Sequence, residues 1–106
     1  MTVTIDFVTP VSRTLTVEGV DVVVSPLRVK EVPAVVRHLD GLLANLVYEA
    51  GSMDVPRMLA LMGDHGDAII AATAICIRQP LAWVEQLYAD RLAALALLAV
   101  EVNSDF

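Results

Sequence analysis

The sequence predicts a mainly α-helical single domain of four to five helices with an N-terminal β-hairpin, which is an α+β fold by strict count. The chain has 106 residues, near the commonest domain size, and no linker, repeat or low-complexity segment divides it. Residues before position 26 alternate and are rich in β-branched side chains, whereas later residues repeat with a helical period. We therefore expect one domain, 1–106, made of an extended segment 1–10, a hairpin 11–25 and a helical part 28–106.

The expected hairpin consists of two short strands joined by a glycine turn. Residues 11–17 and 20–25 are rich in valine and threonine, which favour strands. Glycine in the intervening Glu18-Gly19 can take a positive φ angle. Because a lone hairpin is only marginally stable in water, it must pack on the helices or pair with another chain through its free edges. The residues expected at such a self-association surface are Leu15, Val17, Val22 and Val24.

The first helical region contains one continuous apolar stripe. Its members follow the spacing of a single helix face and are Val32, Val35, Val36, Leu39, Leu42, Leu43, Leu46 and Val47. Pro33 is tolerated there only in the first turn. The pattern predicts one uninterrupted helix over 32–47, ended by Gly51-Ser52.

Three shorter helices are expected next. Asp54, two residues before Pro56, is placed to open a short helix that carries Met58, Leu59, Leu61 and Met62. The run 63–66 (GDHG) predicts a tight connection to a second, central apolar helix over 68–78. Gln79-Pro80 then ends that helix and begins a third, which stops near Asp90.

The last helix, 91–103, is the most informative element. Between Arg91 and Glu101 lie nine residues with no polar side chain, all Leu, Ala or Val. Leu and Ala are strong helix formers, and Asp90 is positioned as an N-cap. A helix that is apolar all round must be covered on every side. We expect that so small a chain cannot supply this cover, so that part of the helix meets another molecule.

Composition argues against several classes of partner. Thirteen acidic residues stand against seven basic ones, a net charge of −6, which disfavours nucleic acid binding. Although 57% of the residues are hydrophobic, no uncharged apolar run approaches the roughly 18 residues that span a bilayer, and the first residues do not resemble a secretory signal. We therefore expect no membrane contact. Cys76 has no disulfide partner in the chain, which is typical of a cytoplasmic protein.

One group of residues could support catalysis. His38 and Asp40, with Asp64, His65 and Asp67, offer two imidazoles and three carboxylates to a divalent metal ion. Their spacing fits no ligand pattern, and aspartate and glycine are usual between helices. The chain has no nucleophile elbow, Walker loop or dinucleotide-binding turn. We expect no enzyme, cofactor or metal, and keep a small metal-dependent enzyme built on His38, Asp64, His65 and Asp67 as a competing hypothesis.

The order of elements resembles that of a known family. The residues that carry the resemblance are Val22-Val23-Val24-Ser25-Pro26-Leu27, the segment around Trp83, Asp90-Arg91-Leu92 and the ending Glu101-Val102-Asn103-Ser104-Asp105-Phe106. From about Leu15 to its end, the chain resembles the small tail assembly chaperones of long-tailed bacteriophages and prophages. The resemblance implies an oligomeric protein of the host cytoplasm, which keeps the long helical tape measure protein soluble. Tail tube protein would then displace it, leaving none in the mature virion.

The resemblance and the apolar last helix together give the expected partner-binding surface. Its residues are Trp83, Leu87, Leu92, Leu95, Leu98, Val102, Asn103, Asp105 and Phe106. The expected partners are the tape measure protein, tail tube protein and further copies of the chain. The sequence is also compatible with a tail morphogenesis component that stays in the virion, and with an antitoxin-like dimer.

Overall fold

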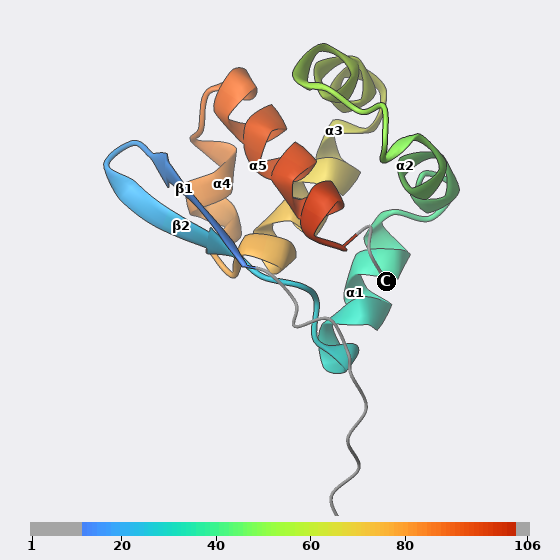
Figure 1. Ribbon diagram of the computed structural model, residues 1–106, viewed down its shortest axis with the longest axis horizontal. Helices are drawn as coiled ribbons and strands as arrows, with labels where there is room; N and C mark the ends of the chain where they lie inside the picture. The colour runs from blue at the N-terminus through green and yellow to red at the C-terminus, as the bar shows by residue number, and fades with distance from the viewer. Residues whose placement is uncertain (1–11, 104–106) are drawn as a thin grey trace, which may run out of the picture.

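The computed structural model describes residues 12–103, so the expected extended segment 1–10 and the predicted partner-binding residues Asp105 and Phe106 lie outside the described residues. The elements are β1 (Arg13–Val17), β2 (Val20–Val24), the 3-10 helix η1 (Val29–Glu31), α1 (Val32–His38), α2 (Leu43–Glu49), α3 (Val55–Ile77), α4 (Leu81–Glu85) and α5 (Ala89–Asn103). Figure 1 shows the hairpin on one side of the molecule and α2 on the other, with α5 between them. The predicted fold class, mainly helical with an N-terminal hairpin, is confirmed.

The hairpin has the predicted turn. β1 and β2 are antiparallel, with Val17 paired to Val20 across a two-residue loop. Glu18 (φ 53°) and Gly19 (φ 77°) both take positive φ angles, which suits the turn that matches strand twist in short hairpins. The hairpin packs on α5 and α3. The structure therefore shows the hairpin stabilised by packing on the helices, which is one of the two expected ways.

The prediction of one helix over 32–47 is wrong. The chain forms α1 and α2, separated by a turn at residues 39–42 in which Gly41 has φ 79°. A right-handed helix cannot include that angle, and glycine adopts it without a steric penalty. Leu39 (7% exposed) and Leu42 (1%) still reach the core from the turn. Other stripe residues do not, because Val32 (40%), Val36 (43%) and Val47 (69%) are exposed, so only part of the stripe is buried.

The two helices predicted on either side of residues 63–66 form one kinked helix, α3. Its backbone departs from helical angles at His65 (φ −133°, ψ 35°), so the expected connection is a kink and not a loop. Asp54 caps the helix as predicted, with its Oδ1 accepting a hydrogen bond from the Arg57 amide at 2.9 Å. Pro56 lies in the first turn, where its missing N–H costs nothing.

The core is organised around the contact between α3 and α5. Its most completely buried large side chains come from every layer of the fold and are Leu42, Met58, Leu95, Val17, Val22, Val24 and Val84. α5 begins at Ala89, so Asp90 lies in its first turn and is not the predicted N-cap. There its negative charge still favours the positive end of the helix dipole.

The fold covers most of α5 by itself. Of the nine apolar residues in its centre, five are buried (Leu92, Ala93, Leu95, Ala96 and Ala99), and four are partly exposed (Ala94, Leu97, Leu98 and Val100). The expectation that so small a chain could not cover this helix is therefore largely wrong, because α3 and the hairpin both pack against it. The most exposed large apolar side chains of the described residues lie elsewhere: Val29 (88%), Val47 (69%), Tyr48 (91%) and Tyr88 (72%).

α3 is long and apolar enough, by length and composition alone, to cross a membrane. This differs from the expectation of no such segment, because the two halves predicted separately form one helix of 23 residues. The helix carries Asp64 and Asp67 near its middle, is kinked at His65, and packs against α1, α4 and α5. These features are typical of the core helix of a globular domain.

An ion pair connects the exit of the hairpin to the end of α3. Arg78 Nη2 donates to Glu31 Oε1 at 2.7 Å and to the Pro26 carbonyl at 3.1 Å, and Glu31 also accepts from the Arg28 amide at 2.8 Å. Partial burial raises the pKa of Glu31, but the Arg28 and Arg78 hydrogen bonds and the charges of the two guanidiniums outweigh it, so the net pKa is lowered. The charged form of Glu31 is therefore favoured by the folded state.

Candidate functional site

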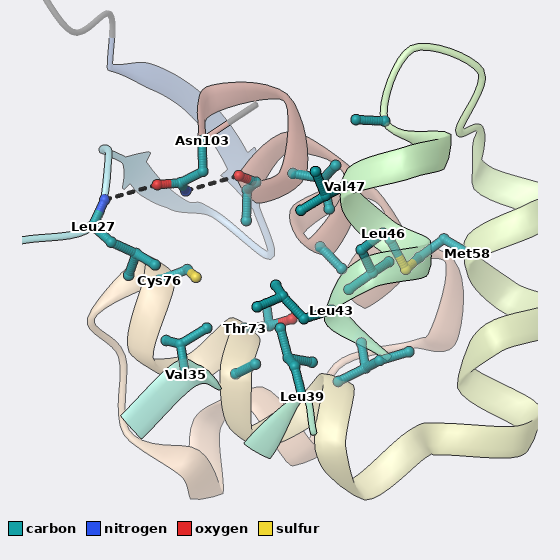
Figure 2. Close-up of a pocket in the computed structure, with 16 residues that line it drawn as sticks. Leu27, Val35, Leu39, Leu43, Leu46, Val47, Met58, Thr73, Cys76 and Asn103 are labelled. Atoms are coloured by element: carbon teal, nitrogen blue, oxygen red, sulfur yellow. Dashed lines mark hydrogen bonds between the residues drawn. The ribbon is translucent and has the colours of Figure 1, made fainter. Parts of the chain in front are cut away.

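An apolar pocket of about 120 Å³ lies beside α2, and we call it the α2 pocket (Figure 2). Its walls come from four helices and from the segment after β2. The lining residues are Leu27, Val35, Leu39, Leu43, Leu46, Val47, Ala50, Met58, Ile69, Ala72, Thr73, Cys76, Ala96, Ala99, Val100 and Asn103. Figure 2 shows Leu46 and Val47 of α2 on the opposite side of the pocket from Cys76 of α3.

Short side chains on the α3 and α5 walls explain why this space is not filled. Ala72 of α3 and Ala96 and Ala99 of α5 all line it, and each ends at Cβ. Alanine lets two helices approach closely, but its short side chain does not reach far enough to fill the space toward a third helix. The opposite wall must then be supplied by longer residues of α2, which reach only partway.

α2 is held loosely compared with the other helices. It has seven residues, and Gly41 and Gly51 lie in the turns on either side. Extensive backbone contact between described elements involves α3, α5, α1, α4 and the hairpin, but not α2. Its main polar link is to α3, where Arg57 Nε and Nη2 donate to the two carboxylate oxygens of Glu49, each at 3.1 Å. An exposed ion pair of this kind contributes little to stability, so α2 is retained chiefly by the buried side chains of Leu46 and of Leu42, the residue before it.

The polar atoms that line the pocket are already engaged or uncharged. Asn103 Oδ1 accepts from the Leu27 amide and its Nδ2 donates to the Ala99 carbonyl, both at 2.9 Å (Figure 2). Burial raises the pKa of the Cys76 thiol to about 11, an effect that the nearby Arg78 charge only partly offsets. The thiol is therefore protonated near neutral pH and a poor nucleophile. The α2 pocket is suited to holding an apolar group.

The residues of the hypothetical metal-dependent enzyme do not form a site. Within residues 12–103, no three His, Cys, Asp or Glu side chains are placed to hold one metal ion. His38 and Asp40 are exposed near the end of α1, whereas Asp64, His65 and Asp67 are exposed around the kink of α3. The structure thus offers no support for an enzyme built on this set.

The predicted partner-binding residues are not gathered on one exposed surface. Leu92, Leu95 and Val102 are core residues, exposed by 4%, 0% and 8%. Half-buried side chains that pack against the core make up a second group, namely Trp83, Leu87 and Leu98. Asn103 lines the α2 pocket, although its hydrogen bonds fix the end of α5 to the segment after β2.

The residues proposed for self-association also face inward. Val17, Val22 and Val24 are exposed by 2%, 0% and 0%, and Leu15 is partly buried against the same core. In this fold their side chains are not at the surface, and pairing with another chain would have to use the backbone edges of the hairpin.

Sequence reasoning did not identify the α2 pocket. One signal was present in Val47, the last member of the apolar stripe, which lines the pocket and is 69% exposed in the structure. A large exposed apolar side chain beside a surface concavity is typical of an interaction site. The alanines of the far wall gave no signal, because in the sequence they are indistinguishable from close-packing residues.

Comparison with known proteins assigns the chain to a family but gives it no function. No curated protein and no solved structure matches the sequence at a significant level. A family model described as "Family of unknown function (DUF6631)" matches residues 5–106, so the chain belongs to this family.

Proposed function

We propose that this protein is a tail assembly chaperone of a long-tailed bacteriophage or prophage, which binds apolar helical segments of the tape measure protein. The α2 pocket is the observation that carries the proposal. It is lined almost wholly by apolar side chains, its polar side chains are hydrogen-bonded or uncharged, and Val47 extends the apolar surface outward. A site of this kind suits an apolar side chain of another molecule and offers no group for catalysis.

The size of the site fits a chaperone better than a permanent partner. One pocket of about 120 Å³ gives a small contact area, and hence weak binding by a single copy. Many copies along one long client would cover it through repeated weak contacts. Each contact could then be replaced in turn, as displacement by tail tube protein requires.

The charge of the chain fits the same task. A tape measure protein exposes long apolar stripes, which aggregate when unprotected. A coat of subunits that each carry a net charge of −6 would give the complex a strongly negative surface. Like-charged complexes repel one another and stay soluble in the host cytoplasm.

Co-expression with the tape measure protein of the same phage or prophage tests the proposal. We expect the chaperone to raise the soluble yield of the tape measure protein and to co-purify with it. Proteomics of purified particles should then find the tape measure protein but not this chain. Unchanged solubility together with no co-purification would contradict the proposal, and detection of the chain in the particles would favour a retained tail component instead.

A further inference from the structure

We propose that the α2 pocket selects a basic amphipathic helix, whose apolar side chain enters the pocket while its Lys and Arg side chains face the acidic surroundings. This inference deepens the proposed function, because it gives the chemistry of the client segment. It makes a separate claim, however, since it concerns charge and shape at one site and not the identity of the client protein.

The volume of the pocket sets the size of the occupant. A dry apolar cavity of roughly 150 Å³ in another protein holds one benzene molecule. The α2 pocket, at about 120 Å³, is therefore matched to a single Leu, Ile or Phe side chain. The polar side chains that line it are uncharged, and Asn103 keeps its hydrogen bonds to Leu27 and Ala99, so an apolar occupant would not deprive Asn103 of its partners.

The rim of the pocket favours a helix over an extended chain. Val47 lines the pocket and is 69% exposed, so it extends the apolar surface outward at the rim. A helix that places one residue in the pocket also presents apolar residues three and four positions away. Those neighbours can rest on Val47, which extends the apolar contact beyond the pocket itself.

The charges around α2 are mostly negative. Residues 37–77 carry five carboxylates and two guanidiniums, those of Arg37 at the end of α1 and of Arg57, which is paired with Glu49. Asp40 and Asp54 lie in the turns on either side of α2, and neither forms an ion pair within the described part of the chain. Three of the seven basic residues, Arg13, Arg28 and Lys30, lie around the hairpin and η1. Lys and Arg on a client would therefore be attracted to this face.

The same charges argue against a second copy as the occupant. Another copy would bring a net charge of −6 toward this acidic surface, and the like charges would repel. Anionic lipid is disfavoured for the same reason. A cationic amphipathic helix gains affinity both from apolar contact with the pocket and from attraction to the carboxylates around it.

The test uses the full chain and three synthetic helical peptides of about 18 residues, or five turns. One has a leucine face and a lysine face, the second replaces each lysine by glutamate, and the third scrambles the first. Fluorescence anisotropy gives the affinity of the full chain for each peptide. We expect the lysine peptide to bind about tenfold or more tightly than the others, a difference of about 1.4 kcal/mol.

Two variants place the binding at the pocket. Ala99→Leu fills it from α5, and Val47→Lys puts a positive charge at its exposed rim, which removes apolar contact and repels the lysine face; each should lower the affinity for the lysine peptide by about tenfold or more. Val23→Lys is the matched control, because Val23 is 50% exposed on the outer face of the hairpin and does not line the pocket. Circular dichroism checks that each variant is folded. Since Val47 is a surface residue, its variant decides the question even if Ala99→Leu does not fold.

Several results would overturn the inference. These are equal affinity for the lysine and glutamate peptides, or an affinity for the lysine peptide that is unaffected by Val47→Lys. Self-association that is lost in Val47→Lys, without peptide binding, would assign the pocket to a second copy. Peptide binding without solubilisation of the tape measure protein would support this inference and refute the proposed function. Solubilisation of the tape measure protein without binding of the lysine peptide would support the proposed function and refute this inference.

Discussion

Filling the α2 pocket from within should stabilise the protein, and Ala99→Leu is the clearest way to do so. Ala99 lies on α5, is 7% exposed and lines the pocket. The substitution adds three carbon atoms that point toward a space of about 120 Å³, which is enough for several carbons without displacing a neighbour. The change keeps the helix propensity high, because leucine is nearly as good a helix former as alanine.

The expected gain follows from the buried carbons and their lost freedom. Three methylene equivalents at about 0.8 kcal/mol each would contribute roughly 2.4 kcal/mol if fully buried. Ordering the leucine side chain costs about 0.5–1 kcal/mol, and the open side of the pocket leaves part of the side chain in water. We therefore expect an increase of about 1 kcal/mol in the free energy of unfolding, which corresponds to about 4–8 °C in Tm for a domain of this size.

Urea denaturation followed by circular dichroism measures the change in free energy, and Ala94→Leu on the same helix is its control. Ala94 is partly exposed and does not line the pocket, so the same three carbons should change the stability by less than about 0.5 kcal/mol. If Ala99→Leu lowers the free energy of unfolding by about 1 kcal/mol or more while Ala94→Leu is neutral, the added carbons are overpacked. The space beside α2 would then not exist in solution, and the proposed binding site would lose its basis.

Three further predictions concern the elements that frame the pocket. Gly41→Ala should lower the free energy of unfolding by about 1–2 kcal/mol in urea because of its φ of 79°, whereas Gly63→Ala within α3 should raise it by about 0.5–1 kcal/mol. Asn103→Ala should cost about 1–3 kcal/mol in the same assay by leaving the Leu27 amide without its acceptor. Because the folded state lowers the pKa of Glu31, its contribution is complete above the pKa of the unfolded chain and is lost as the pH falls through the folded value. Thermal unfolding of Glu31→Gln should thus show a shallower loss of Tm on acidification than the natural chain; an identical acid slope would refute that role.

The parts of the fold that depend on local chemistry could be predicted from the sequence. The hairpin requires only alternating strand formers around Glu18-Gly19, and the start of α3 requires only the Asp54 cap and Pro56 in the first turn. Each of these signals acts within a few residues, so no knowledge of the rest of the chain is needed. Both were confirmed.

The errors arose where tertiary contacts decide between local conformations. Gly41 lies within a stripe of correct helical period, and a helix tolerates an isolated glycine, so the pattern did not show that the backbone turns there. At residues 63–66 two glycines predicted a loop, but burial of Leu61 and Ile69 on either side favours a continuing helix that yields only at His65. The bond from Asn103 to the Leu27 amide joins residues 76 positions apart, and no local pattern signals it.

The binding surface also depends on which apolar residues are small. The apolar run in α5 predicts that this helix has more apolar surface than the domain can cover. Most of that surface is covered, however, because alanines let α3 and α5 pack closely. The same alanines, Ala72, Ala96 and Ala99, leave the space beside α2 that larger residues would have filled. Close packing of one helix pair and an open pocket at its side therefore have a single cause. A family member that carries larger residues at these three positions should have a tighter core and no α2 pocket, and by this reasoning it should not bind the lysine-leucine helix.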